Sequence, residues 1–269
     1  MYGAILGDII GSPFEFDKGE KTKDFKLFTE GCRFTDDSVM TVAVAEALLS
    51  LDQNADDQTV EQTLIKSMQK WGRKYPEAGY GRRFYNWLFQ NDPVPYHSYG
   101  NGSAMRVSSV GWLYPTLEKT RKIAVLTAKV THDHEEGLKG AEATAGCIFL
   151  ARKKKSKDQI RSFIIQEFGY DLSKTLDEIR PDHHMDVSCQ GTVPEAVLCF
   201  LEANSYEDTV RNAVSLGGDT DTLAAIAGSI AEAYYKIPDK LKEECEKRIT
   251  EEMKHVIRNF ILKKDPYNQ

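Results

Sequence analysis

The sequence predicts an all-α fold. Apolar residues recur mainly at spacings of three and four, as in Val60, Leu64, Met68 and Trp71, which is the stripe of an amphipathic helix. Strand-like alternation is nearly absent. The content of 41% hydrophobic and 28% charged residues is ordinary for a globular protein, and 269 residues suffice to bury one large core. We therefore expect residues 1–269 to form one compact domain of roughly ten helices.

Periodicity and start signals locate the individual helices. One stripe contains Val60 and Trp71, and another contains Leu138 and Ile148. Ser205 followed by Asp208 resembles a capping box. The other helices are expected at residues 36–50, 103–113, 119–130, 157–168, 193–203, 206–215, 221–235 and 239–262.

Three stretches have the least helical character, namely residues 12–35, 74–103 and 180–192. They hold much of the Gly, Pro and aromatic content, and binding residues often lie on such loops. The only charge run, residues 152–155, closes an apolar helix, where cations complement the negative helix terminus. We expect that run to be a solvated helix end.

Charge and cysteine content exclude several classes of protein. With 41 acidic and 35 basic residues, the net charge of -6 gives no general attraction for a phosphate backbone, so no stable nucleic-acid complex is expected. The five cysteines are odd in number and lack a C-x-x-C pair, which favours free thiols. Neither a basic leader nor a membrane-length apolar run is present. We expect a cytoplasmic protein without membrane contact, and a monomer, although the sequence does not set the oligomeric state.

The first chemical motif is Phe34-Thr35-Asp36-Asp37-Ser38, which precedes an apolar helix. Thr and Asp at this position are ordinary helix caps, because they accept hydrogen bonds from the first-turn amides. Adjacent carboxylates with a hydroxyl also offer several hard oxygen ligands, which suit Mg²⁺, Mn²⁺ or Ca²⁺ rather than zinc.

The second motif is Gly217-Gly218-Asp219-Thr220-Asp221-Thr222, again at the start of a long apolar helix. Two acidic clusters at helix starts exceed what capping requires, so together they favour metal binding. Neither has the glycine and terminal glutamate of an EF-hand loop. A phosphoaspartyl phosphatase is disfavoured, because its D-x-D motif follows a buried strand, whereas Asp219 and Asp221 follow a helical stretch.

Two further motifs suggest ligand contacts. The loop Tyr99-Gly100-Asn101-Gly102-Ser103-Ala104-Met105-Arg106 leads into a helix, where outward-pointing amides suit a diphosphate, although a plain capping turn explains the segment equally well. Thr131-His132-Asp133-His134 precedes another helix. Its histidines are candidates for metal ligation, for a polar contact to phosphate or ribose, or for a cap.

Taken in order, GAILGDIIGSPFE, FTDDS, GNGSAMR, THDH and SLGGDTDT resemble the ADP-ribosylglycohydrolase family, of the type that reactivates dinitrogenase reductase. The resemblance spans residues 2 to about 235. It implies an all-α fold with two divalent cations, Mg²⁺ or Mn²⁺, at the base of a cleft. It also implies a hydrolase that cleaves the glycosidic bond between ADP-ribose and an acceptor.

The resemblance assigns roles to individual positions. The metal ligands it implies are Thr35, Asp36, Asp37, Asp219, Asp221 and Thr222, with Asp221 placed to bridge both ions. Glu15 matches a mobile glutamate beside the metals, and the catalytic acid or base is expected among Glu15, Asp36 and Asp37. The substrate contacts it implies are Gly100, Asn101, Gly102, Ser103, Met105 and His132.

Several points stay open at this level. Tyr80, Phe84, Tyr96 and Tyr99 compete as the aromatic residue that stacks on adenine, and Glu77 lies near the position of an extra acid that some members use for arginine-linked substrates. The acceptor is undecided among arginine, serine, a nucleic-acid base and free ADP-ribose derivatives. A non-catalytic, crystallin-like or ADP-ribose-binding member is the alternative, although all the expected acids are present.

Overall fold

The computed structural model describes residues 1–52 and 54–264, and within them the chain is helical without a β-strand. The all-α prediction is confirmed. One isolated backbone bridge joins Gly100 and Ser188. The elements are α1 (Tyr2–Gly11), the 3₁₀ helix η1 (Ser12–Phe14), α2 (Asp36–Ser50), α3 (Asp57–Lys74), α4 (Arg82–Leu88), α5 (Gly102–Met105), α6 (Val110–Leu113), α7 (Leu117–Lys129), α8 (Glu135–Arg152), α9 (Lys157–Phe168), α10 (Leu176–Ile179), α11 (Cys189–Leu201), α12 (Tyr206–Leu216), α13 (Thr220–Tyr234), α14 (Asp239–Glu246) and α15 (Glu251–Lys264).

The predicted helix boundaries hold for most of the long helices, and α2 and α9 match to the residue. The helix expected at 239–262 is wrong, because it is two helices, α14 and α15. Thr250 starts the second one by accepting a hydrogen bond from the amide of Met253. The helix expected at 103–113 is also two short helices, α5 and α6, and the segment between them contains Ser108 and Ser109, which favour turns over helix interiors.

Three of the described α-helices were not predicted, namely α1, α4 and the single turn α10. Helix α1 lies in the N-terminal stretch, and α4 lies within residues 74–103, which had little helical character. The part of the chain that the structure describes has fifteen α-helices, several of them a single turn, rather than about ten.

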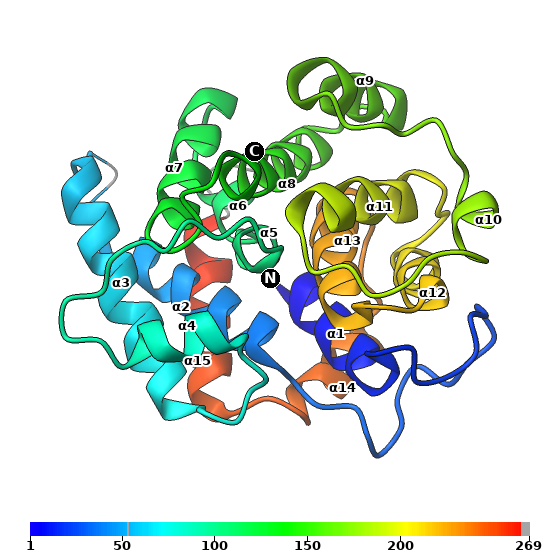
Figure 1. Ribbon diagram of the computed structural model, residues 1–269, viewed down its shortest axis with the longest axis horizontal. Coiled ribbons are helices and arrows are strands. Elements are labelled where there is room, and N and C mark those ends of the chain that lie inside the picture. The colour runs from blue at the N-terminus through cyan, green and yellow to red at the C-terminus, as the bar shows by residue number, and fades with distance from the viewer. Residues whose placement is uncertain (53, 265–269) are drawn as a thin grey trace.

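The packing of α1 on α13 brings the N-terminus of the chain beside a helix more than 200 residues later (Figure 1). Gly3, Gly7 and Gly11 form the contact face of α1, since a Cβ at Gly7 would lie 2.0 Å from the carbonyl oxygen of Ala224. The glycines therefore permit backbone-to-backbone approach. This approach places the C-terminal half of α1 against the first turn of α13, where the second acidic motif lies.

The charge run at residues 152–155 is not wholly a solvated helix end. Arg152 is buried at 7% exposure, and its guanidinium donates to the backbone carbonyls of Trp112 and Tyr114, whereas the three lysines that follow are exposed. Tertiary packing therefore uses the first cation of the run to satisfy carbonyls near the end of α6.

The five cysteines are buried and free, and nearly all buried apolar side chains belong to one cluster. None of the described helices combines the length and apolarity needed to cross a bilayer.

Candidate active site

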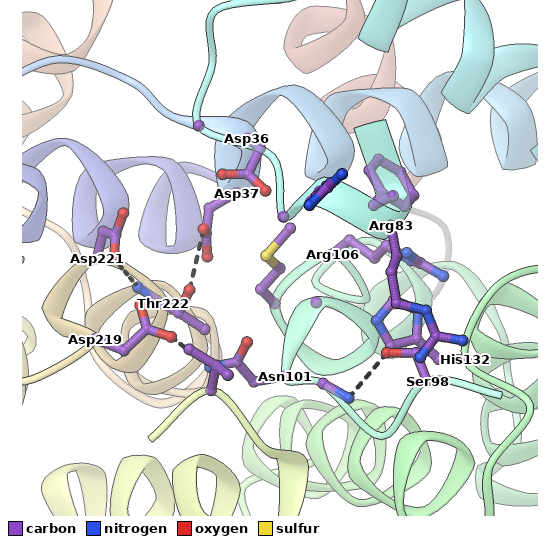
Figure 2. Close-up of a pocket in the computed structure, with 18 of the residues that line it drawn as sticks. Asp36, Asp37, Arg83, Ser98, Asn101, Arg106, His132, Asp219, Asp221 and Thr222 are labelled. Carbon is purple, nitrogen blue, oxygen red and sulfur yellow. Dashed lines mark hydrogen bonds between the residues drawn. The ribbon is translucent and has the colours of Figure 1, made fainter. Parts of the chain in front are cut away.

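A cavity of about 480 Å³ opens between the N-termini of α2 and α13 and the loop that leads into α5. Its two ends differ in charge (Figure 2). Carboxylates from α2 and from the start of α13 line one end, and Arg83, Arg106 and His132 line the other. A cavity of this size matches small-molecule sites in general.

The first acidic motif forms the N-terminus of α2. Thr35 is the N-cap and accepts from the amide of Asp37, so the capping interpretation holds for Thr35. It does not account for the two acids, which line the cavity. The amide of Asp36 donates to the carbonyl of Ala78 at 2.9 Å, which fixes the start of α2 against the loop before α4.

Asp8 of α1 organises this motif, although sequence analysis did not select it. It is fully buried and accepts hydrogen bonds from the backbone amides of Thr35 and Ser38 and from both of their hydroxyls. The Thr35 hydroxyl donates its hydrogen to Asp8 and accepts from the amide of Asp37, so one of its lone pairs stays available to a cation. The signal in the sequence was a lone acid within an apolar, glycine-rich segment.

The second acidic motif enters α13 through two glycines with positive φ, Gly217 at 81° and Gly218 at 71°. Asp219 occupies the N-cap position but makes no side-chain capping bond, so a simple cap does not explain it. Its carboxylate instead accepts from the side-chain amide of Asn101 at 2.6 Å. Asp221 accepts from the amide of Thr222, and the Thr222 hydroxyl donates to Asp37 at 3.2 Å, which joins the two motifs.

The electrostatics of this acidic end are unfavourable without cations. Burial and the neighbouring Asp221 raise the pKa of Asp8 to about 7, and they raise the pKa values of Asp36, Asp37 and Asp219 well above the usual range. None of these acids forms a salt bridge within the described residues. The Oδ1 atom of Asp37 is buried without a hydrogen-bond partner. Buried carboxylates, hydroxyls and an unpaired oxygen are a donor set that fits a hard divalent cation.

Glu15 lies next to these acids, directly after η1. Oxygen atoms of Glu15, Asp219 and Asp221 lie within 4.8 Å of one another, which is close enough to share a cation. Burial and Asp221 raise the pKa of Glu15 to about 7, against an opposing effect of Lys18 and Arg33. Glu15 is therefore the half-buried acid of the cavity with a pKa near neutrality.

The residues of the loop that leads into α5 (Tyr99–Arg106, the glycine loop) differ in what they contact. Gly100, Gly102 and Met105, three of the expected substrate contacts, line the cavity. Asn101 also lines it, but its amide group is engaged with Thr192 and Asp219, so it supports the acidic motif. The hydroxyl of Ser103 donates to the carbonyl of Gly137 at 2.7 Å, and this fully buried residue is not among those that line the cavity, unlike the substrate contact that was expected.

The two histidines of the THDH motif have different roles. His134 is the N-cap of α8 and accepts from the amide of Glu136, so the cap interpretation describes it. His132 is 5% exposed and lines the cavity. Burial, with Arg106 and Arg83 nearby, lowers its pKa well below the usual value, so the ring is neutral.

The structure narrows the choice of aromatic residue. Phe84 and Tyr96 line the cavity, whereas Tyr80 and Tyr99 do not. Glu77 is exposed and is not among the lining residues. Sequence analysis also missed Arg106, although it closes the GNGSAMR motif. It missed further lining residues for which no local pattern was evident: Arg82, Arg83, Ser98, Met185 and Val187.

Together, the fold and the cavity define an all-helical protein with a deep pocket that has a buried acidic end suited to cations. The ADP-ribosylglycohydrolase family model matches residues 1–267, and the chain belongs to that family.

Curated relatives agree with this assignment. Human ADP-ribosylhydrolase ARH3 is 27% identical over 91% of this chain and 88% of its own. ADP-ribosylarginine hydrolase Tri1 of Pseudomonas putida is 23% identical over 92% of this chain and 72% of its own. A solved structure titled ADP-ribosylglycohydrolase-related protein complex has the same fold, with a TM-score of 0.69 at 24% identity over 97% of this chain and 95% of its own. These relatives support a hydrolase of ADP-ribosylated substrates, but not the expected dinitrogenase-reductase-activating subtype.

Proposed function

We propose that this protein cleaves the glycosidic bond between ADP-ribose and an acceptor, using two divalent cations, Mg²⁺ or Mn²⁺. The observation that carries the proposal is the convergence of two acidic helix starts on one cavity that also contains the glycine loop. Thr35, Asp36, Asp37, Asp219, Asp221 and Thr222 would hold the cations. When bound, such cations polarise substrate oxygens and lower the pKa of water.

The protein's own groups explain how the acidic end can be prepared for that role. The hydroxyl hydrogens of Thr35 and Thr222 point to Asp8 and Asp37, so both threonine oxygens present a lone pair. Asn101 orients Asp219 from the opposite wall. These contacts fix the oxygen donors before any ligand arrives, which reduces the cost of ordering them on binding.

Glu15 is our first choice for the general acid or base. A group with a pKa near 7 can both accept and release a proton at neutral pH, which is the condition for efficient proton transfer. Asp36 and Asp37 are the other two candidates, but the hydrogen bond from Thr222 to Asp37 gives Asp37 a structural duty as well. Cleavage at ribose develops oxocarbenium-like charge, and this carboxylate-rich end of the cavity would stabilise it.

The opposite end of the cavity suits the rest of an ADP-ribose molecule. Gly100 and Gly102 allow a diphosphate to approach the backbone, and Phe84 and Tyr96 offer aromatic surface for adenine. The acceptor would then leave from the acidic end, where Phe16 lines the cavity and its amide donates to the carbonyl of Gly218. The names of the relatives include an ADP-ribosylarginine hydrolase, so arginine is one acceptor to test beside serine, a nucleic-acid base and free ADP-ribose derivatives.

The test is release of ADP-ribose from defined substrates with each of these four acceptor types, at saturating Mg²⁺ or Mn²⁺. We expect turnover on at least one acceptor and none after chelation. Binding of ADP-ribose without turnover on any acceptor would favour the non-catalytic alternative. Turnover that survives thorough chelation would contradict the use of cations.

A further inference from the structure

A chain of buried polar side chains lies behind His132. The guanidinium of Arg106 donates to the Thr127 carbonyl at 2.6 Å and to the Thr131 hydroxyl oxygen at 2.8 Å. That hydroxyl lies 2.7 Å from Nδ1 of His132. Arg106, Thr131 and His132 are 1%, 0% and 5% exposed, so water does not replace these bonds. Arg106 has no carboxylate partner within the described residues. Its hydrogen bonds to Thr127 and Thr131 are therefore its main contacts.

The direction of each hydrogen bond follows from counting protons. A guanidinium only donates, so the oxygen of Thr131 accepts from Arg106. The hydroxyl then has one hydrogen to give, either to Nδ1 of His132 at 2.7 Å or to the carbonyl of Ala128 at 3.5 Å. The second distance is outside the usual range for an O–H donor, so the hydrogen goes to Nδ1.

This direction fixes the state of the imidazole ring. If Nδ1 accepts, the ring carries its proton on Nε2. A charged ring would need a hydrogen on Nδ1 as well, and the nearby cations Arg106 and Arg83 oppose it. Tyr96, whose ring centre is 5.9 Å away, is the other titratable group beside the imidazole, and it is protonated at neutral pH because its pKa is about 12.

The Nε2 atom faces the glycine loop. A Cβ at Gly102 would lie 3.3 Å from Nε2, and one at Gly100 would lie 3.5 Å from it. Within residues 1–52 and 54–264, no protein acceptor bonds to Nε2, and His132 lines the cavity. Figure 2 shows His132 and Arg106 at the end opposite the carboxylates. The N–H group is therefore directed at whatever occupies the space over the loop.

We propose that Arg106 and Thr131 are positioning residues that lock His132 as the neutral Nε2–H tautomer, so that it donates one fixed hydrogen bond to an oxygen of bound ADP-ribose. The identity of the ligand rests on the proposed function, whereas the tautomer is a property of the free protein. A locked neutral donor binds its ligand without taking up a proton, so this contact stays constant across neutral pH.

The tautomer is tested by nitrogen NMR of ligand-free protein labelled with ¹⁵N-histidine, from about pH 5.5 to pH 8 around the ordinary histidine pKa. The His132 signals are assigned by their loss in His132→Gln. We expect a protonated Nε2 and a bare Nδ1 throughout in the wild type and in Thr131→Ser, and a mixture of states in Thr131→Val. A wild-type ring that is protonated at Nδ1 would overturn the proposal, even if Thr131→Val does not fold.

The consequence for binding is tested by calorimetry with ADP-ribose. Thr131→Val should bind roughly three- to tenfold more weakly, the usual worth of one hydrogen bond, whereas Thr131→Ser should match the wild type. His132→Gln can place an amide donor near the Nε2 position and should bind better than His132→Leu. In Thr131→Val the ring can also carry its proton on Nδ1, and that tautomer offers the ligand no hydrogen from Nε2.

Two outcomes separate this inference from the proposed function. If Thr131→Val loses the locked tautomer but keeps wild-type affinity, the positioning role is wrong. If the wild type does not bind ADP-ribose at all, the proposed function fails with the ligand part of this inference, and the NMR result still decides the tautomer.

Discussion

The two ends of the cavity carry opposite charges, and the protein itself compensates these charges to different degrees. At the acidic end, Asp36, Asp37 and Asp219 have raised pKa values, and one oxygen of Asp37 has no hydrogen-bond partner, so the protein alone leaves their charge uncompensated. At the basic end, Arg106 and His132 are equally buried, but hydrogen bonds with carbonyl and hydroxyl oxygens of the protein already orient both side chains. The comparison teaches that the acidic end has a set of oxygen donors that a cation would complete, whereas hydrogen bonds within the protein already orient the basic end.

The largest expected effect is at the acidic motif of α13. Asp219→Asn and Asp221→Asn keep a polar side chain of the same size but remove the charge that a divalent cation needs. Each should reduce turnover by at least about a hundredfold, because even losses outside the ligand shell cost 10- to 100-fold. Turnover is measured on an ADP-ribosylated substrate at saturating Mg²⁺ or Mn²⁺.

Asp158→Asn is the control, since Asp158 is an exposed acid in the first turn of α9. Circular dichroism checks that all three variants are folded. Wild-type rates in folded Asp219→Asn and Asp221→Asn would remove these residues from the mechanism.

Cations should stabilise the protein through its acidic end. A ligand that binds only the folded state at 100 times its dissociation constant adds about 2.7 kcal/mol. We therefore expect Mg²⁺ or Mn²⁺ to raise the Tm of the chelated protein in a concentration-dependent manner. If calorimetry detects no binding of either ion, the acidic end is not a cation site.

Substitution of Asp8 tests whether its hydrogen bonds to Thr35 and Ser38 keep the metal-binding oxygens of the acidic end in position. Asp8→Asn puts an amide nitrogen among four hydrogen-bond donors and should lower metal affinity by roughly 10- to 100-fold. Glu232→Gln makes the same acid-to-amide change at the far end of the α1–α13 contact, where Glu232 pairs with the N-terminal amine. Equal metal affinity in both variants would mean that Asp8 has only a general structural role.

A smaller effect is expected at Gly102, beside His132. Gly102→Val would bring a side chain against Nε2 of His132 and should weaken ADP-ribose binding by roughly tenfold, about 1.4 kcal/mol, without changing metal binding. Gly81→Val is the matched control, because Gly81 also lines the cavity but has open space where its Cβ would lie. Equal losses of affinity would place the ligand elsewhere.

The smallest effect is the contribution of Glu15 to the pH dependence of the metal-free protein. The pKa of Glu15 rises from 4.5 to about 7 on folding, so its contribution to stability is present below 4.5 and is lost as the pH rises through 7. After discounting for solvent, this amounts to about 1 kcal/mol, or a Tm change of about 2–4 °C. Glu15→Gln should show a correspondingly smaller decline, measured by thermal denaturation.

Added Mg²⁺ or Mn²⁺ should reverse this trend, because cations compete with protons for the carboxylates. A Tm gain from the cation that is larger at low pH than at high pH would contradict the assignment of these acids as ligands.

The sequence by itself determined the helical class, most of the long helices and the two acidic motifs, because periodicity and helix-start residues are local signals. Only the tertiary structure decided that Asp8 supports Thr35, that Asn101 holds Asp219 and that Ser103 is not among the residues that line the cavity. It also decided that Arg106 and Thr131 define the proton on His132. These contacts join residues up to 118 positions apart. The residues that form these contacts come together only when the helices and loops pack in the folded protein. A local sequence pattern does not indicate which distant residues will meet.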